Sequence, residues 1–189
     1  TLSNTLTIIV NDVFKNCTSL QSIVIPECVK TIGDSAFYSC SSLQSIVIPN
    51  SVTRINISAF QNCSSLQSID LPSTLTSIGS SAFYGCSSLQ NVVIPEGVTS
   101  IESGVFYDCS SLQSIVIPNN ATSIGMNVFN GCSKLQSIVI PNSVMNIGLA
   151  SFSRCSNLLS IVVSEGNLVY DSRDNCNAII KTASGELIL

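Results

Sequence analysis

Nine cysteines are the side chains with the most chemistry to offer in this 189-residue chain, and no histidine accompanies them. Seven of the nine recur every 23 residues, whereas Cys28 and Cys176 lie outside that period. The periodic cysteines are Cys17, Cys40, Cys63, Cys86, Cys109, Cys132 and Cys155. Such a pattern is open to three interpretations: a disulfide framework, a metal site, or a column of buried thiols.

Geometry favours the buried column. If 23-residue units stack in register, every Cβ of the column points the same way, and neighbouring sulfurs lie one strand spacing, ~4.8 Å, apart. A disulfide needs sulfurs ~2.05 Å apart, so bridging would distort the stack, and an odd column would leave one thiol over. A metal needs ligands that converge tetrahedrally, which a straight column does not supply. We therefore predict packing thiols that donate weakly to loop carbonyls, with bridges and metal as less favoured alternatives.

The two off-period cysteines stay open. Cys28 falls in the turn after Pro26, where other repeats carry Ser, Thr, Gly or Asn, and we expect it to be exposed. It is either drift of the repeat or a reactive thiol that forms dimers on oxidation. Cys176 lies in the C-terminal segment and allows both interpretations.

The pattern does not predict catalysis. A nucleophilic cysteine or serine needs a general base within hydrogen-bond range, and the chain has no histidine to serve as one. The eleven acidic residues are dispersed, except for Asp171 and Asp174, which flank Arg173 and are typical of a solvated turn. No Gly-rich phosphate loop occurs. We therefore predict that the chain is not an enzyme and has no cofactor.

Composition narrows the class of protein further. Apolar residues make up 45% of the chain and charged residues 10%, which excludes a disordered polar chain. Seven scattered Lys and Arg residues and a net charge of −4 argue against a nucleic-acid surface. No apolar run approaches the ~18 residues of a membrane helix. No signal peptide is visible at Thr1, although the chain can be the mature part of an exported protein.

The 23-residue period also fixes every Phe and every Pro of the chain. Each unit contains a phrase such as "LQSIVIP", which is rich in β-branched residues, ends at Pro and predicts a short strand. A second extended piece, such as "VTRI", precedes a Gly or Asn at 33, 56, 79, 125 and 148, where tolerance of positive φ predicts a sharp turn. "SAFYGC" then predicts a tight helical turn that buries the Phe. The periodic phenylalanines are Phe14, Phe37, Phe60, Phe83, Phe106, Phe129 and Phe152.

Units of 23 residues bury an apolar face only by stacking on one another, so the repeat predicts a solenoid. Leu43, Ile46 and Ile48 follow the L-x-x-L-x-L spacing of leucine-rich repeats. The predicted fold is therefore a leucine-rich-repeat solenoid of the α/β repeat class, β-dominated and right-handed, with about seven rungs. One concave parallel sheet lines it, and turns or helical turns and short extended segments form the other sides. Residues 1–166 form the solenoid, whose first repeat is incomplete, as in a fragment of a longer array. Residues 167–189 form a non-repeat cap or joint, predicted to be a hairpin.

The repeat phrase resembles the BspA-like (TpLRR-class) leucine-rich repeats over roughly residues 5–163. The matching residues follow A-F-x-x-C-x-S-L-x-S-I-x-I-P-x-S-V-T-x-I-G, and "YDSRDNCNAII" resembles a segment found between or after repeats in such proteins from gut bacteria. Val10 and Glu102 depart from the usual turn Gly, and Ser164 replaces Pro. The resemblance implies a secreted or surface-anchored bacterial protein that acts in adhesion to host extracellular-matrix or other cell-surface proteins. The family pattern contains no catalytic residues.

The outward positions of the predicted concave sheet form the candidate binding face. A nearly continuous Val column, edged by small polar side chains, would give an apolar strip of about 300 Å², near the size at which such patches often signal function. The alternative is that Val simply suits a parallel strand and is copied by duplication. Asp70, the only charge in the column, marks specificity or drift; unpaired, it should stay wet or meet a cation. The face comprises Val24, Val47, Asp70, Val93, Val116, Val139, Val162, Ser45, Ser68, Asn91, Ser114 and Ser137.

Three hypotheses about function follow. The first is a non-catalytic adhesion module that holds a protein on its concave face; protein is favoured over carbohydrate because the face carries no aromatic platform. The second is a stiff spacer, with binding carried elsewhere. The third is end-to-end self-association through unpaired terminal rungs. Tyr38, Tyr84 and Tyr107 on the convex side form the runner-up patch.

Overall fold

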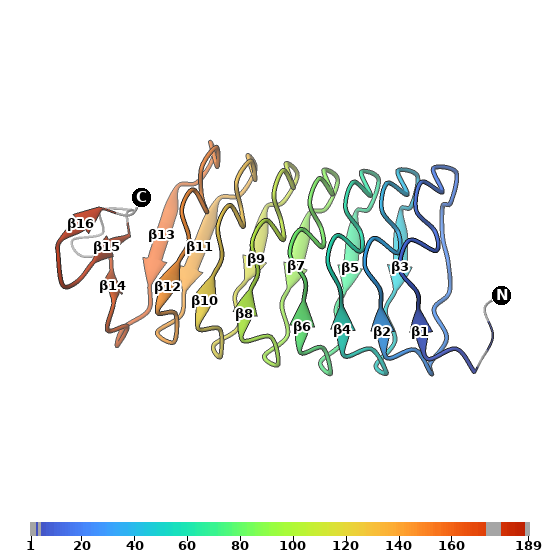
Figure 1. Cartoon of the computed structure of the whole chain (residues 1–189). Coiled ribbons are helices and arrows are strands. Elements are labelled where there is room, and N and C mark those ends of the chain that lie inside the picture. Colours follow the sequence, from blue (N-terminus) through green and yellow to red (C-terminus); the bar gives the residue numbers. More distant parts are fainter. Residues whose placement is uncertain (1–2, 4, 173–178, 188–189) are drawn as a thin grey trace.

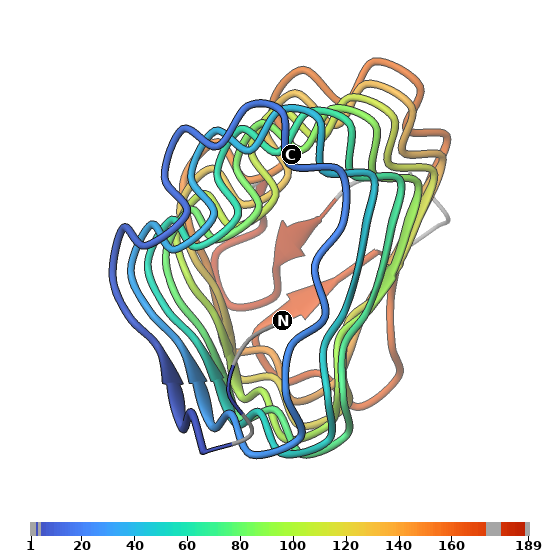
Figure 2. The ribbon, with the colours of Figure 1, turned by 90° about the vertical axis from the view of Figure 1, so that its right-hand side faces the viewer.

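The predicted repeats stack into a solenoid in the computed structural model, which describes residues 3, 5–172 and 179–187. Viewed along its axis, successive rungs superpose as one closed outline (Figure 2). Two ladders of parallel strands run along the solenoid. In each ladder a residue pairs with the residue 23 positions further along the chain, as in Ser45↔Ser68. The first and last rungs lie at opposite ends (Figure 1).

The first ladder consists of two-residue strands, whose second residue faces the core. We call the surface formed by their first residues the short-strand face. The strands are β1 (Ile8–Ile9), β2 (Thr31–Ile32), β4 (Arg54–Ile55), β6 (Ser77–Ile78), β8 (Ser100–Ile101), β10 (Ser123–Ile124) and β12 (Asn146–Ile147).

The second ladder consists of strands of three or four residues and corresponds to the predicted concave sheet. Its outward surface is here called the long-strand face. The strands are β3 (Ser45–Val47), β5 (Ser68–Asp70), β7 (Asn91–Val93), β9 (Ser114–Val116), β11 (Ser137–Ile140) and β13 (Ser160–Val163). Val24 joins the ladder through an isolated parallel bridge to Val47.

The corner that carries each Phe is a hydrogen-bonded turn and not a helical one; the described ranges contain no helix. Two residues per corner have positive φ, such as Ser35 at 52° and Ser39 at 56°, and a left-handed residue interrupts any right-handed helix. Backbone amides here bond across rungs. The Phe37 amide donates to the Ala59 carbonyl at 2.8 Å, and the same bond recurs along the array.

The glycines that follow the two-residue strands are required because the backbone of the preceding rung lies too close for a side chain. The expectation that they adopt positive φ is wrong. Neither Gly33 nor Gly79 has positive φ. A Cβ added to Gly79 would lie 2.5 Å from the Ile57 backbone nitrogen of the preceding rung. At Glu102 the ladder is interrupted, since β6 and β8 belong to separate sheets.

Apolar side chains fill the interior. The Phe rings form one stack, with successive centroids 5.1–6.0 Å apart and nearly parallel planes. Phe37, Phe60, Phe83, Phe106 and Phe129 are fully buried. Phe14 is only half-buried because it lies in the first rung and has a Phe neighbour on one side only.

The C-terminal segment departs from the pattern of parallel rungs. Strands β14 (Tyr170–Asp171), β15 (Ile180–Lys181) and β16 (Glu186–Leu187) pair antiparallel in that order. Asn167 donates to the carbonyls of Pro141 and Val144 at 3.0 and 2.9 Å, and the Tyr170 hydroxyl accepts from the Ile147 amide. These bonds join the C-terminal segment to the last rungs, and the assignment of this segment as a cap or joint stays a prediction. The division at residue 166 stays a prediction.

Candidate binding face

The candidate residues form continuous exposed columns on the long-strand face. Strands β3, β5, β7 and β9 alternate exposed, buried, exposed, as a half-buried strand must. The exposed fraction of the Val column falls from 80% at Val24 to 46% at Val162. Each outward Val or Asp is preceded by a buried Ile or Val, except that Ile23 in the first rung is half-buried. The columns contain all twelve residues that the sequence assigned to the face.

Small polar groups edge the Val column. Ser45, Ser68 and Ser137 are exposed, and the Ser114 hydroxyl donates to the Asn91 side-chain oxygen at 2.7 Å. Gln side chains precede these positions in six rungs and are exposed too. A ligand on this surface would therefore meet apolar methyl groups in the middle and hydrogen-bonding groups along one side.

Asp70 is exposed and has no cation within ion-pair distance among the described residues. It lines a pocket of about 410 Å³ between the rungs of β5 and β7. Leu71, which also lines this pocket, is half-buried, although its equivalents Ile48 and Ile94 are buried.

The pocket lies where strand pairing is incomplete. Strands β3 and β5 pair through three residues, as do β7 and β9, but β5 and β7 pair only through Ser68↔Asn91. A second interruption separates β9 from β11, which belong to different sheets. A smaller pocket of about 200 Å³ lies there, lined chiefly by apolar residues such as Val116, Val139 and Pro141.

Sequence reasoning missed three residues of this surface. Leu71 and Ser73 line the Asp70 pocket, and Leu159, 74% exposed, extends the apolar strip next to β13. The available signal was departure from the repeat: "SIDLPST" replaces the usual "SIVIPNS", and Leu159 stands where the other rungs carry Gln.

The cysteine column lies inside the array. Cys40, Cys63, Cys86, Cys109 and Cys132 are buried, and Cys155 is half-buried. Each of these six thiols donates to the carbonyl of a Phe in the preceding rung at 3.0–3.2 Å. Burial raises the pKa of the Cys63 thiol to about 12, and those of Cys40 and Cys155 to about 11. The thiols therefore stay protonated near neutral pH.

Two cysteines differ from their expected environments. Cys17, in the first rung of this chain, is exposed, whereas the rest of the column is covered as expected. Cys28, expected to be exposed, is half-buried, and its thiol donates to the Leu6 carbonyl at 3.0 Å. The same side chain-to-carbonyl bond recurs one rung further along, where Ser51 donates to the Val29 carbonyl at 2.6 Å. Cys176 lies outside the described residues.

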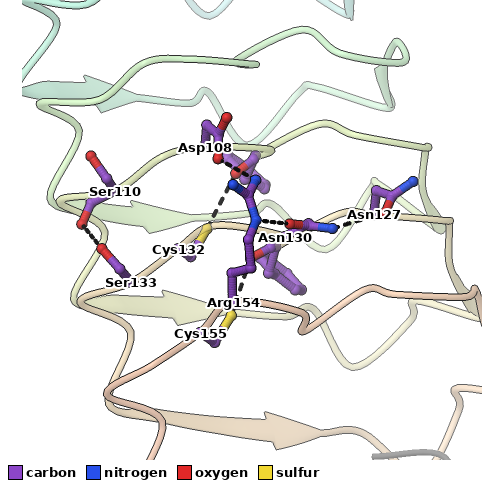
Figure 3. A network of polar contacts seen from close by, with 10 residues as sticks. Asp108, Ser110, Asn127, Asn130, Cys132, Ser133, Arg154 and Cys155 are labelled. Atoms are coloured by element: carbon purple, nitrogen blue, oxygen red, sulfur yellow. Dashed lines mark hydrogen bonds and ion pairs between the residues drawn. The ribbon is translucent and has the colours of Figure 1, made fainter.

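The tyrosines on the turn side line a pocket of about 390 Å³ at Tyr84 and Tyr107, but their ring faces are partly covered. Tyr84 and Tyr107 stack with centroids 4.6 Å apart, and the Arg154 guanidinium lies 5.4 Å from the Tyr107 centroid. Arg154 also donates to Asp108 at 2.7 Å and to Asn130 at 2.8 Å, which ties three rungs together (Figure 3). Tyr107 is therefore covered on both faces. Tyr38 is half-buried, with Lys15 5.5 Å from its centroid.

Other kinds of site have few candidates. No three His, Cys, Asp or Glu side chains gather around a common point in the ranges that the structure describes. Over the same ranges, the chain forms no helix with the length and apolarity to cross a membrane.

Comparison with known proteins gives one family. The model of the BspA type leucine rich repeat region matches residues 1–109 and 76–176, in six copies. No curated protein matches the chain.

Solved structures of bacterial proteins are similar over most of the chain. A leucine rich cell surface protein from Faecalibacterium prausnitzii is 36% identical over 96% of this chain and 48% of its own, with a TM-score of 0.86. The leucine rich repeat protein of T. pallidum (TpLRR) is 31% identical over 81% of this chain and 72% of its own, with a TM-score of 0.75. A leucine-rich repeat protein from Bacteroides ovatus is 33% identical over 85% and 48%, with a TM-score of 0.74. The chain thus spans about half the length of two of these three.

Proposed function

Because the chain belongs to the BspA-type leucine-rich repeat family, we propose that it is a non-catalytic protein-interaction module whose long-strand face holds an extended protein segment. The observation that carries this proposal is the exposed column that spans seven rungs, with Val in six of them and Asp70 in the other. Isolated exposed apolar residues are ordinary, but a contiguous strip of about 300 Å² is often an interaction site.

The kind of partner follows from the surface. A flat strip with methyl groups in the middle and hydroxyl and amide groups at its side suits an extended peptide. Carbohydrate is disfavoured because the tyrosine rings lie on the turn side and Tyr107 is covered on both faces. A location outside the cell or on its surface, and adhesion to extracellular-matrix or other cell-surface proteins, fit the description of the Faecalibacterium protein as a cell surface protein.

The second candidate function is a stiff spacer within a longer surface protein. Backbone bonds between rungs on the turn side, together with both strand ladders, favour a rigid rod. In that case the partner binds outside residues 1–189. End-to-end self-association through the half-buried side chains Leu6, Phe14 and Leu20 of the first rung is a further outcome.

The test replaces two outward residues of the long-strand face. Val93→Glu with Val116→Glu should abolish binding to a panel of purified extracellular-matrix and cell-surface proteins, because it puts two charges into the apolar strip. The matched control is Ser77→Glu with Asn146→Glu, which adds the same charge at exposed positions of the short-strand face. Circular dichroism and thermal melts establish that both variants are folded.

The outcomes separate the candidate functions. Binding lost in the Val93/Val116 variant and kept in the control supports the long-strand face. Binding kept in both variants points to another surface. No binding by the parent chain favours the spacer, and a concentration-dependent mass in sedimentation favours self-association.

A further inference from the structure

We propose that the pocket beside Asp70 receives the side chain of a lysine or arginine of the bound segment, and that the smaller pocket between β9 and β11 receives an apolar side chain three residues away. This inference rests on the proposed function and names the chemistry of the partner that the long-strand face selects.

Charge is the first argument. Asp70 is the only charged residue among the outward positions of the long-strand face, so its carboxylate sets the potential there. It is exposed, and no described Lys or Arg side chain neutralises it. A carboxylate at the centre of an apolar strip penalises a purely apolar ligand, because covering it would remove water without supplying a partner. A partner that supplies a cation avoids that penalty and gains a charge-assisted hydrogen bond.

The shape of the pocket is the second argument. Incomplete pairing of β5 with β7 opens a space of about 410 Å³ next to the carboxylate. Leu71, Val93 and Pro95 supply apolar walls, which suit the methylene stem of Lys or Arg. Ser68 and Asn91 supply oxygen atoms that can accept hydrogen bonds from an ammonium or guanidinium group.

The spacing of the two pockets is the third argument. The first lies between the rungs of residues 70 and 93, and the second between those of 116 and 139, which is two rungs further along the axis. Two rungs correspond to about 10 Å. An extended chain advances ~3.1–3.4 Å per residue, so a segment lying along the axis covers that distance in three residues. In a polyproline II conformation, side chains three residues apart point the same way.

A bound metal ion is a weaker explanation of the same features. One carboxylate with hydroxyl and amide neighbours supplies few of the oxygen ligands that Ca²⁺ or Mg²⁺ needs. An organic cation requires only one carboxylate and an apolar wall, and that combination is present.

The experiment uses displayed random linear peptides as the probe. Peptides are selected on the full chain and counter-selected on the Val93→Glu/Val116→Glu variant, so that binders of the long-strand face are enriched. Selected peptides are synthesised, and their dissociation constants are measured by fluorescence anisotropy against the parent, Asp70→Asn and the control Glu27→Gln. Glu27 is exposed in the turn after Pro26, so its replacement changes net charge equally, away from the pocket.

We expect the selected peptides to carry Lys or Arg three positions from an apolar residue. Asp70→Asn should weaken them about tenfold, the effect of losing a charge-assisted hydrogen bond, and Glu27→Gln should leave them unchanged. Replacing the basic residue of the peptide by Gln should weaken binding to the parent but not to Asp70→Asn.

The two proposals fail differently. Peptides that depend on Val93 and Val116, lack a common basic residue and ignore Asp70→Asn overturn this inference and leave the proposed function standing. If no selected peptide loses affinity for the Val93→Glu/Val116→Glu variant, both proposals are overturned.

Discussion

At the scale of single residues, the cysteine column is explained by hydrogen bonding as well as by volume. Each thiol from Cys40 to Cys155 donates to a Phe carbonyl of the preceding rung, and that carbonyl also accepts a backbone amide. The Phe83 carbonyl, for example, accepts from the Cys109 thiol and from the Cys86 backbone amide. Alanine would fill less space and donate nothing. A neutral thiol is small, prefers burial and still donates weakly.

The same burial predicts alkaline instability. Because burial raises the pKa of Cys63 to about 12, and those of Cys86 and Cys109 well above 9.0, the folded chain keeps protons that the unfolded chain releases above pH 9. The contribution of the thiols to the free energy of unfolding should therefore be constant below about pH 8 and fall as pH rises from about 9 toward 12. Each buried thiol contributes a slope of about 1.4 kcal/mol per pH unit. Urea unfolding of the reduced chain at several pH values measures this.

The control is the pair Cys86→Ala and Cys109→Ala, which lowers stability at every pH but removes two titrating thiols. Its pH slope between 9 and 10 should be shallower than that of the parent. Equal slopes in the two proteins would mean that thiol ionisation does not cause the loss.

At the scale of elements, each turn corner is decided by where the backbone must be left-handed. In five of the seven corners one such position carries Asn16, Asn62, Gly85, Asp108 or Gly131, residue types that adopt this conformation at low cost; Ser39 and Arg154 occupy it in the other two. Gly131 also leaves a gap through which Arg154 reaches Asp108 across the rung between them (Figure 3). The corner therefore combines a conformational requirement with space for an ion pair.

Replacing Gly131 by Ala should destabilise the chain by at least about 2 kcal/mol. Gly131 has a φ of 80°, and an added Cβ would collide with the Asp108 carboxylate and lie 3.0 Å from Arg154 Nη2. Gly166→Ala is the matched control, since its φ is 82° and the nearest atom to an added Cβ is 3.9 Å away. It should cost about 1 kcal/mol, the strain of the left-handed backbone alone. Equal losses in thermal unfolding would show that the Arg154 bridge adds nothing measurable.

At the scale of the whole molecule, stability should depend on position along the array. Apart from the contacts of Arg154 with Asp108 and Tyr107, strand pairing and core packing join each rung to its neighbours. An interior rung therefore shares two interfaces and the first rung of this chain one. The Phe stack shows this difference directly: Phe83 lies 5.5 and 5.7 Å from its two Phe neighbours and is fully buried, whereas Phe14 is half-buried beside one.

Phe83→Ala should therefore cost about 3–5 kcal/mol, and Phe14→Ala clearly less, because only the first opens a cavity between two rungs. Denaturant unfolding gives both values. Hydrogen exchange should show loosening confined to the first rungs in Phe14→Ala and spread to both sides of the fourth rung in Phe83→Ala. Similar losses for the two variants would contradict a nearest-neighbour array.

The sequence by itself determined the solenoid, its register and the column to which each residue belongs. A strict period of 23 places Phe37 on Phe60 and Val93 beside Val116 whatever the local backbone does, because only stacking buries the apolar face of so short a unit. The outward Val column followed from strand alternation in the same way.

Only the tertiary structure decided the features that arise between rungs. Gly79 is needed because the Ile57 backbone lies too close for a side chain, and the Cys28 thiol donates a hydrogen bond to the Leu6 carbonyl. The Asp70 pocket lies where β5 and β7 pair incompletely. Each of these depends on how one rung sits on the next, and distances between rungs are set by packing of the whole array. A repeat unit read by itself contains no such distances.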